Sequence, residues 1–182
     1  NSLLITPMKY GLISGGKKIR STIIFDTGKI FNLNQKKLIN ICASVECIHS
    51  YSLIHDDLPC MDNDDLRRNQ PSSHIKYGQA NAVLAGDALQ ALAYEIISAD
   101  LHLGADEKVR SIKILSKACG KNGMVYGQYL DIKNETKETK KDEIVLIHSL
   151  KTGKLIECAV MLGQIGNNKN KYTASPVLYN AA

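Results

Sequence analysis

The feature that most constrains this chain is an acidic segment that directly follows a long apolar stretch. Within residues 38–54, apolar side chains such as Ile41, Val45 and Ile48 recur every three or four positions, which is the period of a buried helix. The next residues, 55–68, read HDDLPCMDNDDLRR, with five carboxylates within ten positions and two arginines after them. Five carboxylates repel one another, and burial raises that cost. The segment is therefore expected to face water or to hold divalent cations at the end of a helix.

The residue types in this segment favour a phosphorylated substrate carried on Mg²⁺. Mg²⁺ takes a few carboxylate oxygens together with water and phosphate oxygens, and arginine offers a planar fork of donors that suits phosphate. A solvated acidic loop that breaks at Pro59 is the alternative, because charge runs are mostly solvated. An EF-hand is excluded, since neither its glycine nor its last glutamate is present in a loop starting at Asp57 or Asp62.

Composition favours a single helical domain. The chain has 182 residues, 44% hydrophobic and 23% charged, with only four prolines and little strand-like alternation, which is enough for one substantial core. Its net charge of +5 is mild, and no basic stripe is interleaved with aromatic residues, so nucleic acid is not the expected partner. Three of the four arginines, Arg20, Arg67 and Arg68, lie in segments assigned below to substrate.

Cysteine usage and the longest apolar runs point to a cytoplasmic protein. The five cysteines form no Cys-x-x-Cys pair, and most lie among apolar residues, so we expect reduced, buried thiols. No apolar run approaches the ~18 residues that indicate a membrane span. Residues 1–5 lack a basic leader and a cleavage site, so no signal peptide is expected. The start at Asn1 indicates that the true N-terminus is missing or trimmed.

A second candidate site lies near the N-terminus, where residues 15–20 read GGKKIR. Two glycines and three cations at the head of a helix form a plausible anion cradle, since backbone N–H groups and the helix N-terminus add to the side-chain charge. A flexible surface turn is the alternative. The segment is not a P-loop, because that motif's spacing is absent.

Most of the chain is expected to be helical. Asn34 is a good N-cap for the helix that leads to the acidic segment. Gly153 lies inside a predicted helix, where glycine costs about 1 kcal/mol relative to alanine, so a kink or a close approach is expected there. Gly86-Asp87 interrupts another apolar helix and would allow close packing. The predicted helices cover residues 21–31, 35–57, 79–98, 109–119, 123–132 and 143–163, with connections over 71–78, 100–108 and 134–142.

The 55–68 segment resembles the first aspartate-rich motif of short-chain trans-polyprenyl diphosphate synthases, most closely the bacterial farnesyl type. That type has two extra residues inside the motif, and its acids match Asp56, Asp57 and Asp62. The resemblance extends from about Gly11 to about Gly163. It implies an all-α fold, an antiparallel helix bundle of the isoprenoid synthase type around a central apolar cavity, formed by residues 1–182 as a single domain that lacks its C-terminal part.

The resemblance also implies the chemistry. Isopentenyl diphosphate would be condensed with an allylic diphosphate, dimethylallyl or geranyl, to give farnesyl diphosphate, with Mg²⁺ as cofactor. Asp56 and Asp62 would bind the metal with help from Asp57, and Lys151 would join these three as a catalytic residue. Gln128 would line the pocket and shares a helix face with Asp131. The allylic diphosphate would be held by Arg67, Lys151 and Thr152, and isopentenyl diphosphate by Lys17, Arg20, His49 and Arg68.

Product length is expected to depend on Tyr51 and Ser52. In the family, the residues four and five positions before the first aspartate form the floor of the tunnel for the growing hydrocarbon tail. A bulky aromatic there excludes a further isoprene unit, because a close-packed wall does not yield cheaply. For Tyr51, the alternative is that the side chain only packs in the core. For His49, the alternative is a structural role in place of substrate binding.

Family members are longer and carry a second aspartate-rich motif, whereas no aspartate follows Asp142 here. We therefore expect an incomplete record of a longer enzyme. Geranylgeranyl or geranyl diphosphate synthesis is the alternative within the class. A non-catalytic partner of an active subunit is the alternative outside it. Family members are commonly homodimers, so a homodimer is expected.

Overall fold

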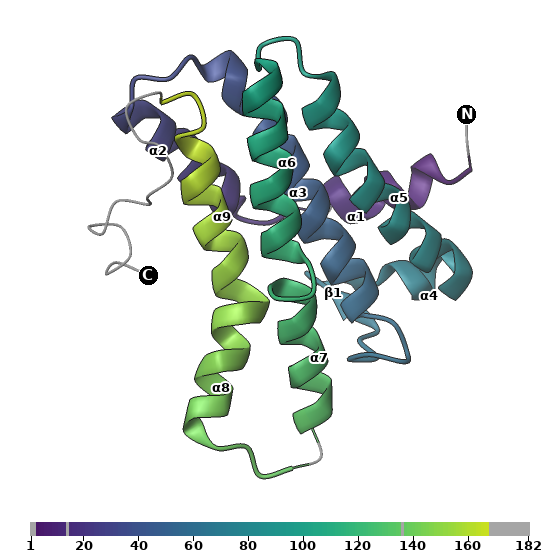
Figure 1. Cartoon of the computed structure of the whole chain (residues 1–182). Helices are drawn as coiled ribbons and strands as arrows, with labels where there is room; N and C mark the ends of the chain where they lie inside the picture. The colour runs from purple at the N-terminus through teal and green to yellow at the C-terminus, as the bar shows by residue number, and fades with distance from the viewer. Residues whose placement is uncertain (1–2, 14, 136, 168–182) are drawn as a thin grey trace.

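Helices make up most of the computed structural model, which describes residues 3–13, 15–135 and 137–167 (Figure 1). The all-α prediction is confirmed, because the two strands found in these ranges are only two residues long each. In order, the elements are α1 (Ile5–Ile13), α2 (Ile19–Ile30), α3 (Gln35–Asp56), β1 (Leu66–Arg67), β2 (Gln70–Pro71), α4 (Ser73–Tyr77), α5 (Gln79–Ala99), α6 (Ala105–Cys119), α7 (Met124–Asn134), α8 (Lys141–His148), the π-helix η1 (Ser149–Gly153) and α9 (Lys154–Gly163).

The centre of the bundle is α3, the helix that leads to the acidic segment. It starts at the predicted N-cap, where the Asn34 side chain accepts a hydrogen bond from the Lys36 amide at 3.0 Å. Its periodic apolar residues, among them Ile41 and Val45, are fully buried between α2 and α5, and each such side chain stabilises the fold by roughly 1.5–3 kcal/mol. The helix ends at Asp56, so the acidic segment begins where α3 ends.

The apolar helix α5 covers one side of α3. It is the single helix in the described ranges that is long and apolar enough to cross a membrane by length and composition. Its residues Ala85, Leu89 and Ala93 are nevertheless fully buried in the common core, as in a bundle helix. Gly86 faces His55 so closely that a Cβ atom would lie 2.1 Å from the imidazole Nε2, which confirms the close packing expected there.

Three local features differ from the sequence-based expectations. The acidic segment ends in a hairpin of β1 and β2, and the connection after it contains the short helix α4. The helix predicted from residue 109 begins four residues earlier, because the Glu107 carboxylate accepts a hydrogen bond from the Gly104 amide at 2.8 Å and so caps α6.

The helix predicted over residues 143–163 is interrupted. It starts at Lys141 and runs as α8, η1 and α9 in one column (Figure 1). The close approach expected at Gly153 lies elsewhere: a Cβ on Gly153 would be 3.8 Å from its nearest neighbour, whereas one on Gly127 in α7 would be 2.2 Å from the Lys151 amide nitrogen. The interruption is thus a π-turn packed against α7, of the kind often found at functional sites.

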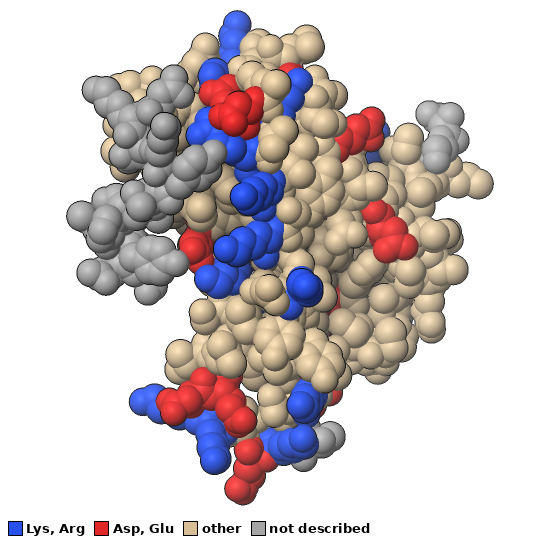
Figure 2. Space-filling model, viewed as in Figure 1, with Lys and Arg blue, Asp and Glu red and all other residues tan. Residues whose placement is uncertain are grey.

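All five cysteines are free thiols, and four of them are buried, with Cys60 exposed. On the face shown in Figure 2, Lys and Arg side chains gather in a short strip over α6 and α9, and mixed charges cover the connection between α7 and α8. The strip borders a groove of about 440 Å³ lined by Arg110, Lys113 and Lys117.

Candidate active site

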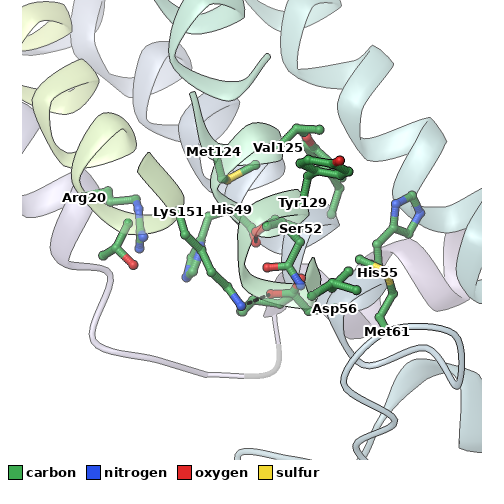
Figure 3. A pocket seen from close by; sticks show the side chains of 15 residues that line it. Arg20, His49, Ser52, His55, Asp56, Met61, Met124, Val125, Tyr129 and Lys151 are labelled. Atoms are coloured by element: carbon green, nitrogen blue, oxygen red, sulfur yellow. Dashed lines mark hydrogen bonds and ion pairs between the residues drawn. The ribbon is translucent and has the colours of Figure 1, made fainter. Parts of the chain in front are cut away.

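The acidic end of α3 opens into a cavity of about 400 Å³. Its walls come from α2, α3, α7 and η1, so four segments distant in sequence meet there (Figure 3). The volume lies within the range of about 300–1,000 Å³ typical of small-molecule sites. Eight residues predicted for the site are among its wall residues: Arg20, His49, Tyr51, Ser52, Asp56, Gln128, Lys151 and Thr152.

Three carboxylates surround the ammonium group of Lys151. The Nζ atom is 2.6 Å from Asp131 Oδ2, 3.9 Å from Asp56 Oδ2 and 4.0 Å from Asp62 Oδ2. Figure 3 shows the Lys151 side chain reaching along the cavity toward Asp56. The structure therefore brings together three of the predicted catalytic residues, Asp56, Asp62 and Lys151.

The charges in this cluster alter one another. Burial raises the pKa of Asp56 to about 6, and the nearby Asp62 adds to the rise while Lys151 opposes it. The end of α3 carries the negative pole of the helix dipole, which also disfavours a carboxylate. Burial alone would lower the pKa of Lys151, but the hydrogen bond to Asp131 and the charges of Asp56 and Asp62 raise it. The acidic end of α3 is thus a place that requires positive charge.

The carboxylate of Asp57 lies elsewhere. It is 2% exposed and accepts hydrogen bonds from both Nε, at 2.9 Å, and Nη2 of Arg67. Both residues line a small separate pocket next to Tyr10 and the hairpin, and neither borders the main cavity. Two predicted site residues, Asp57 and Arg67, are therefore paired with each other beside the cavity.

A second cavity, of about 540 Å³, collects the residues predicted to hold isopentenyl diphosphate. The hairpin turns at Arg68 and Asn69, both with positive φ, as a two-residue hairpin requires. This turn directs the Arg68 guanidinium onto the carbonyl of Gly15. Gly16 has a φ of 108°, and a Cβ there would be 2.7 Å from that guanidinium. The lining consists of Gly15, Gly16, Lys17, Lys18, Ile19, Arg20, Glu46, His49 and Arg68.

Arg20 and His49 border both cavities. Burial, followed by the charge of Arg20, lowers the pKa of His49 to about 4, so the imidazole is neutral at pH 7. Burial likewise lowers the pKa of Arg20, and its Nε atom is buried without a hydrogen-bond partner among the described residues. An unmet buried donor carries a cost, which an anionic ligand would remove.

Three further predicted residues, Tyr51, Ser52 and Gln128, also line the main cavity. Tyr51 is 6% exposed and packs edge-on against His55 at a ring distance of 5.7 Å. The Ser52 hydroxyl donates to the His49 carbonyl at 2.9 Å. Both polar atoms of the Gln128 side chain are buried without a partner in the described part of the chain. Tyr51 thus stands as a bulky wall residue, and Gln128 has unused hydrogen-bonding capacity beside it.

Two acidic residues near the site were not among its predicted catalytic or binding residues: Glu46, which lines the second cavity, and Asp131, which had been expected only in a supporting role beside Gln128. Glu46 accepts a hydrogen bond from Ser21 at 2.7 Å and pairs with Lys18 at 3.1 Å, so it limits the positive charge of the second cavity. Its signal in the sequence was a lone acid in the apolar part of α3. Asp131 holds Lys151, and its signal was the helix face shared with Gln128.

The geometry of the carboxylates fits a divalent cation. Asp56 and Asp62 each place an oxygen about 4 Å from one ammonium nitrogen, which shows that both face a position where a cation is stable. No group of three or more His, Cys, Asp or Glu side chains that could hold a metal occurs in the described ranges. Mg²⁺ is typically bound by one or two carboxylates, and water and substrate oxygens complete its coordination shell.

Comparison with known proteins agrees with this arrangement. The family model described as polyprenyl synthetase matches residues 1–180. The farnesyl diphosphate synthase of Escherichia coli K12 is 46% identical over 180 residues, which cover 98% of this chain and 60% of that protein.

Solved structures have the same fold. The geranyltransferase of Legionella pneumophila superimposes with a TM-score of 0.90 at 38% identity, covering 100% of this chain and 63% of that one. An FPP/GFPP synthase of Zymomonas mobilis gives 0.87 at 42% identity, covering 92% and 62%. This chain thus spans about three fifths of the length of these relatives. With a family model matched over almost every residue, the chain belongs to the polyprenyl synthetase family.

Proposed function

We propose that the protein to which this chain belongs condenses isopentenyl diphosphate with an allylic diphosphate, in the presence of Mg²⁺, to give farnesyl diphosphate. The observation that carries the proposal is the pair of adjoining cavities that share Arg20 and His49. One is lined by cations and suits a diphosphate. The other joins an acidic, cation-requiring mouth to an apolar interior, which suits a hydrocarbon tail with a metal-bound diphosphate head.

In this proposal the residues of the chain bind and orient the two substrates. Lys17, Arg20 and Arg68 hold isopentenyl diphosphate, with His49 donating as a neutral imidazole. Lys151 and Thr152 hold the allylic diphosphate, while Arg67 lies beside the cavity, neutralises the buried Asp57 and adds positive charge near that diphosphate. Mg²⁺ bound by Asp56 and Asp62 would stabilise the negative charge that develops on the leaving diphosphate.

The interior of the main cavity would protect the reacting carbon skeleton from water. Its wall residues Met124, Val125 and Ile132 are apolar, and Tyr51 stands where the tail would end. Farnesyl diphosphate is the proposed product because of this aromatic wall. A longer product, of the kind named for the Zymomonas mobilis relative, is the second candidate.

The test uses the full-length protein with labelled isopentenyl diphosphate and geranyl diphosphate. We expect a labelled C15 product with Mg²⁺ and none with EDTA. A C20 product would contradict the role given to Tyr51. No turnover under any of these conditions would favour a non-catalytic partner and contradict the proposal.

A cytoplasmic homodimer completes the proposal. Helices α5 and α7 leave apolar side chains exposed, including Val83, Leu84 and Tyr126, and such side chains are common at subunit interfaces. Light scattering of the full-length protein should give twice the mass of one chain. A monomer mass at micromolar concentration would contradict this.

A further inference from the structure

The Lys151 ammonium occupies a position between the two carboxylates predicted to hold the metal. Its distances to Asp56 and Asp62 are nearly equal, at 3.9 and 4.0 Å, so it is shared between them. Its one short contact, at 2.6 Å, is with Asp131. The lysine is therefore held by α7, and its ammonium supplies the positive charge at the acidic end of α3.

The backbone fixes this arrangement. Lys151 is the middle residue of the π-turn η1, and its amide lies against Gly127, where a side chain would collide with it. Asp131 follows Gly127 by four residues on α7 and therefore lies on the same helix face. The close contact at Gly127 places the Asp131 carboxylate within reach of the Lys151 side chain.

We propose that Lys151 is an internal counter-ion that competes with the divalent cation for Asp56 and Asp62, and that Asp131 is a positioning residue that holds the ammonium aside when the cation enters. The inference rests on the proposed function only in taking Asp56 and Asp62 as metal ligands. Lysine suits such a role, because its compact charge is carried on a flexible stem.

Electrostatics gives the direction of the effect. A divalent ion held by Asp56 and Asp62 would meet the positive charge of Lys151, whose Nζ atom lies 3.9 and 4.0 Å from their oxygens. The side chain of Lys151 is only 24% exposed, so water screens the repulsion incompletely. A diphosphate that binds at the same time gives the ammonium a new anionic partner. Metal and diphosphate therefore bind cooperatively, each favouring the state in which Lys151 has left the carboxylate pair.

The test measures Mn²⁺ binding to the full-length protein without any diphosphate, from the electron paramagnetic resonance signal of free Mn²⁺. Lys151→Met keeps the length of the side chain and removes its charge, and it should tighten Mn²⁺ binding about tenfold. Asp131→Asn should weaken binding several-fold, because the ammonium then returns to Asp56 and Asp62. In the Lys151→Met background, Asp131→Asn should have no effect.

Lys154→Met is the matched control. Its ammonium pairs with Glu157 at 2.8 Å and borders the groove between α6 and α9, so the same charge is removed without a change in Mn²⁺ affinity. Circular dichroism verifies the helix content of each variant, and Lys151→Gln replaces Lys151→Met if the latter loses helix.

Each outcome decides between the ideas. Equal Mn²⁺ affinity for the wild type and Lys151→Met overturns the inference and leaves the proposed function standing. An equal loss from Asp131→Asn in both backgrounds shows that Asp131 itself binds the metal, which overturns its positioning role. No Mn²⁺ binding by the wild type or any variant overturns the metal site, and with it the proposed function.

Discussion

The backbone of Lys151 lies directly against Gly127, where an added methyl group would come within 2.2 Å of the Lys151 amide nitrogen. Gly127→Ala should therefore displace the π-turn and lower the free energy of unfolding by about 1–3 kcal/mol. Gly153→Ala is the matched control, because its methyl group would find its nearest neighbour at 3.8 Å in a helical backbone. We expect that variant to be more stable by about 0.4–1 kcal/mol. Urea unfolding measures both, and an equal effect of the two substitutions would contradict the packing described.

Loss of Arg67 should expose the cost of a buried carboxylate. Asp57 is 2% exposed, so Arg67→Met leaves a buried carboxylate without its partner. The variant should be less stable at pH 7 by about 1–3 kcal/mol, which is less than for a fully buried pair because Arg67 is itself partly exposed. Without Arg67 the pKa of Asp57 rises further above its unfolded value, so the folded state takes up a proton first and the loss shrinks as the pH falls. Thermal unfolding at pH 7 and pH 5 checks this. A deficit that stays constant or grows toward pH 5 would rule out Asp57 as its cause.

Stability should decline below neutral pH through His49. Its folded-state pKa of about 4 lies below the unfolded value of 6.5, so the unfolded state binds more protons between these values. The stabilisation is complete above about pH 6.5 and is lost as the pH falls toward 4, with a slope of at most about 1.4 kcal/mol per pH unit. His49→Gln removes this titration. The urea midpoint of the wild type should therefore fall more than that of the variant as the pH is lowered over that interval. A difference between the two midpoints that does not change with pH would contradict the burial of a neutral imidazole.

Product length should respond to the volume at Tyr51. Tyr51→Ala in the full-length protein removes the aromatic wall of the main cavity, so chains longer than C15 should appear. Tyr51→Phe keeps the ring and should leave the product unchanged. Chromatography of the dephosphorylated products distinguishes these cases. A C15 product from Tyr51→Ala would place the end of the tunnel elsewhere.

Thiol reactivity should separate Cys60 from the other cysteines. Cys60 is exposed in the acidic segment, while the other four are buried, and burial raises the pKa of Cys42 to about 12 and that of Cys47 to about 11. Ellman's reagent at pH 8 should react quickly with Cys60, and with the other four of these thiols only after unfolding. Cys60→Ser should abolish the fast phase. A second fast thiol in that variant would show that the core opens readily.

The sequence was most informative where a short motif and helical periodicity coincided. The apolar period of α3, its Asn34 cap and the acids at its end predicted both the central helix and the mouth of the cavity. The glycine pair and Arg20 likewise indicated the second cavity. Periodicity did not reveal the π-turn, because the 8 residues of α8 and the 10 residues of α9 are too few to define the phase of two separate apolar stripes.

Pairings between distant segments were also beyond the sequence. The contact of Lys151 with Asp131 depends on how closely α7 approaches η1, and that of Arg67 with Asp57 depends on the path of the hairpin. Gly153 was expected to mark a kink or a close approach. The helix is irregular at that point, but the close contact lies at Gly127, because only the packed structure determines which of two facing helices has no room for a side chain.

The π-turn between α8 and α9 has a consequence for the rest of the column. An extra residue in one turn rotates everything after it by about 100° relative to an uninterrupted α-helix. The direction in which the buried stripe of α9 faces, including Leu155, Ala159 and Leu162, is thus not determined by the direction in which α8 faces. If the same sequence formed an uninterrupted α-helix, that stripe would turn away from the core by about 100°, whereas deleting one residue from η1 would restore a continuous helix with the stripe still in place. The same irregularity thus lets the chain keep its core contacts and hold its lysine at the cavity mouth.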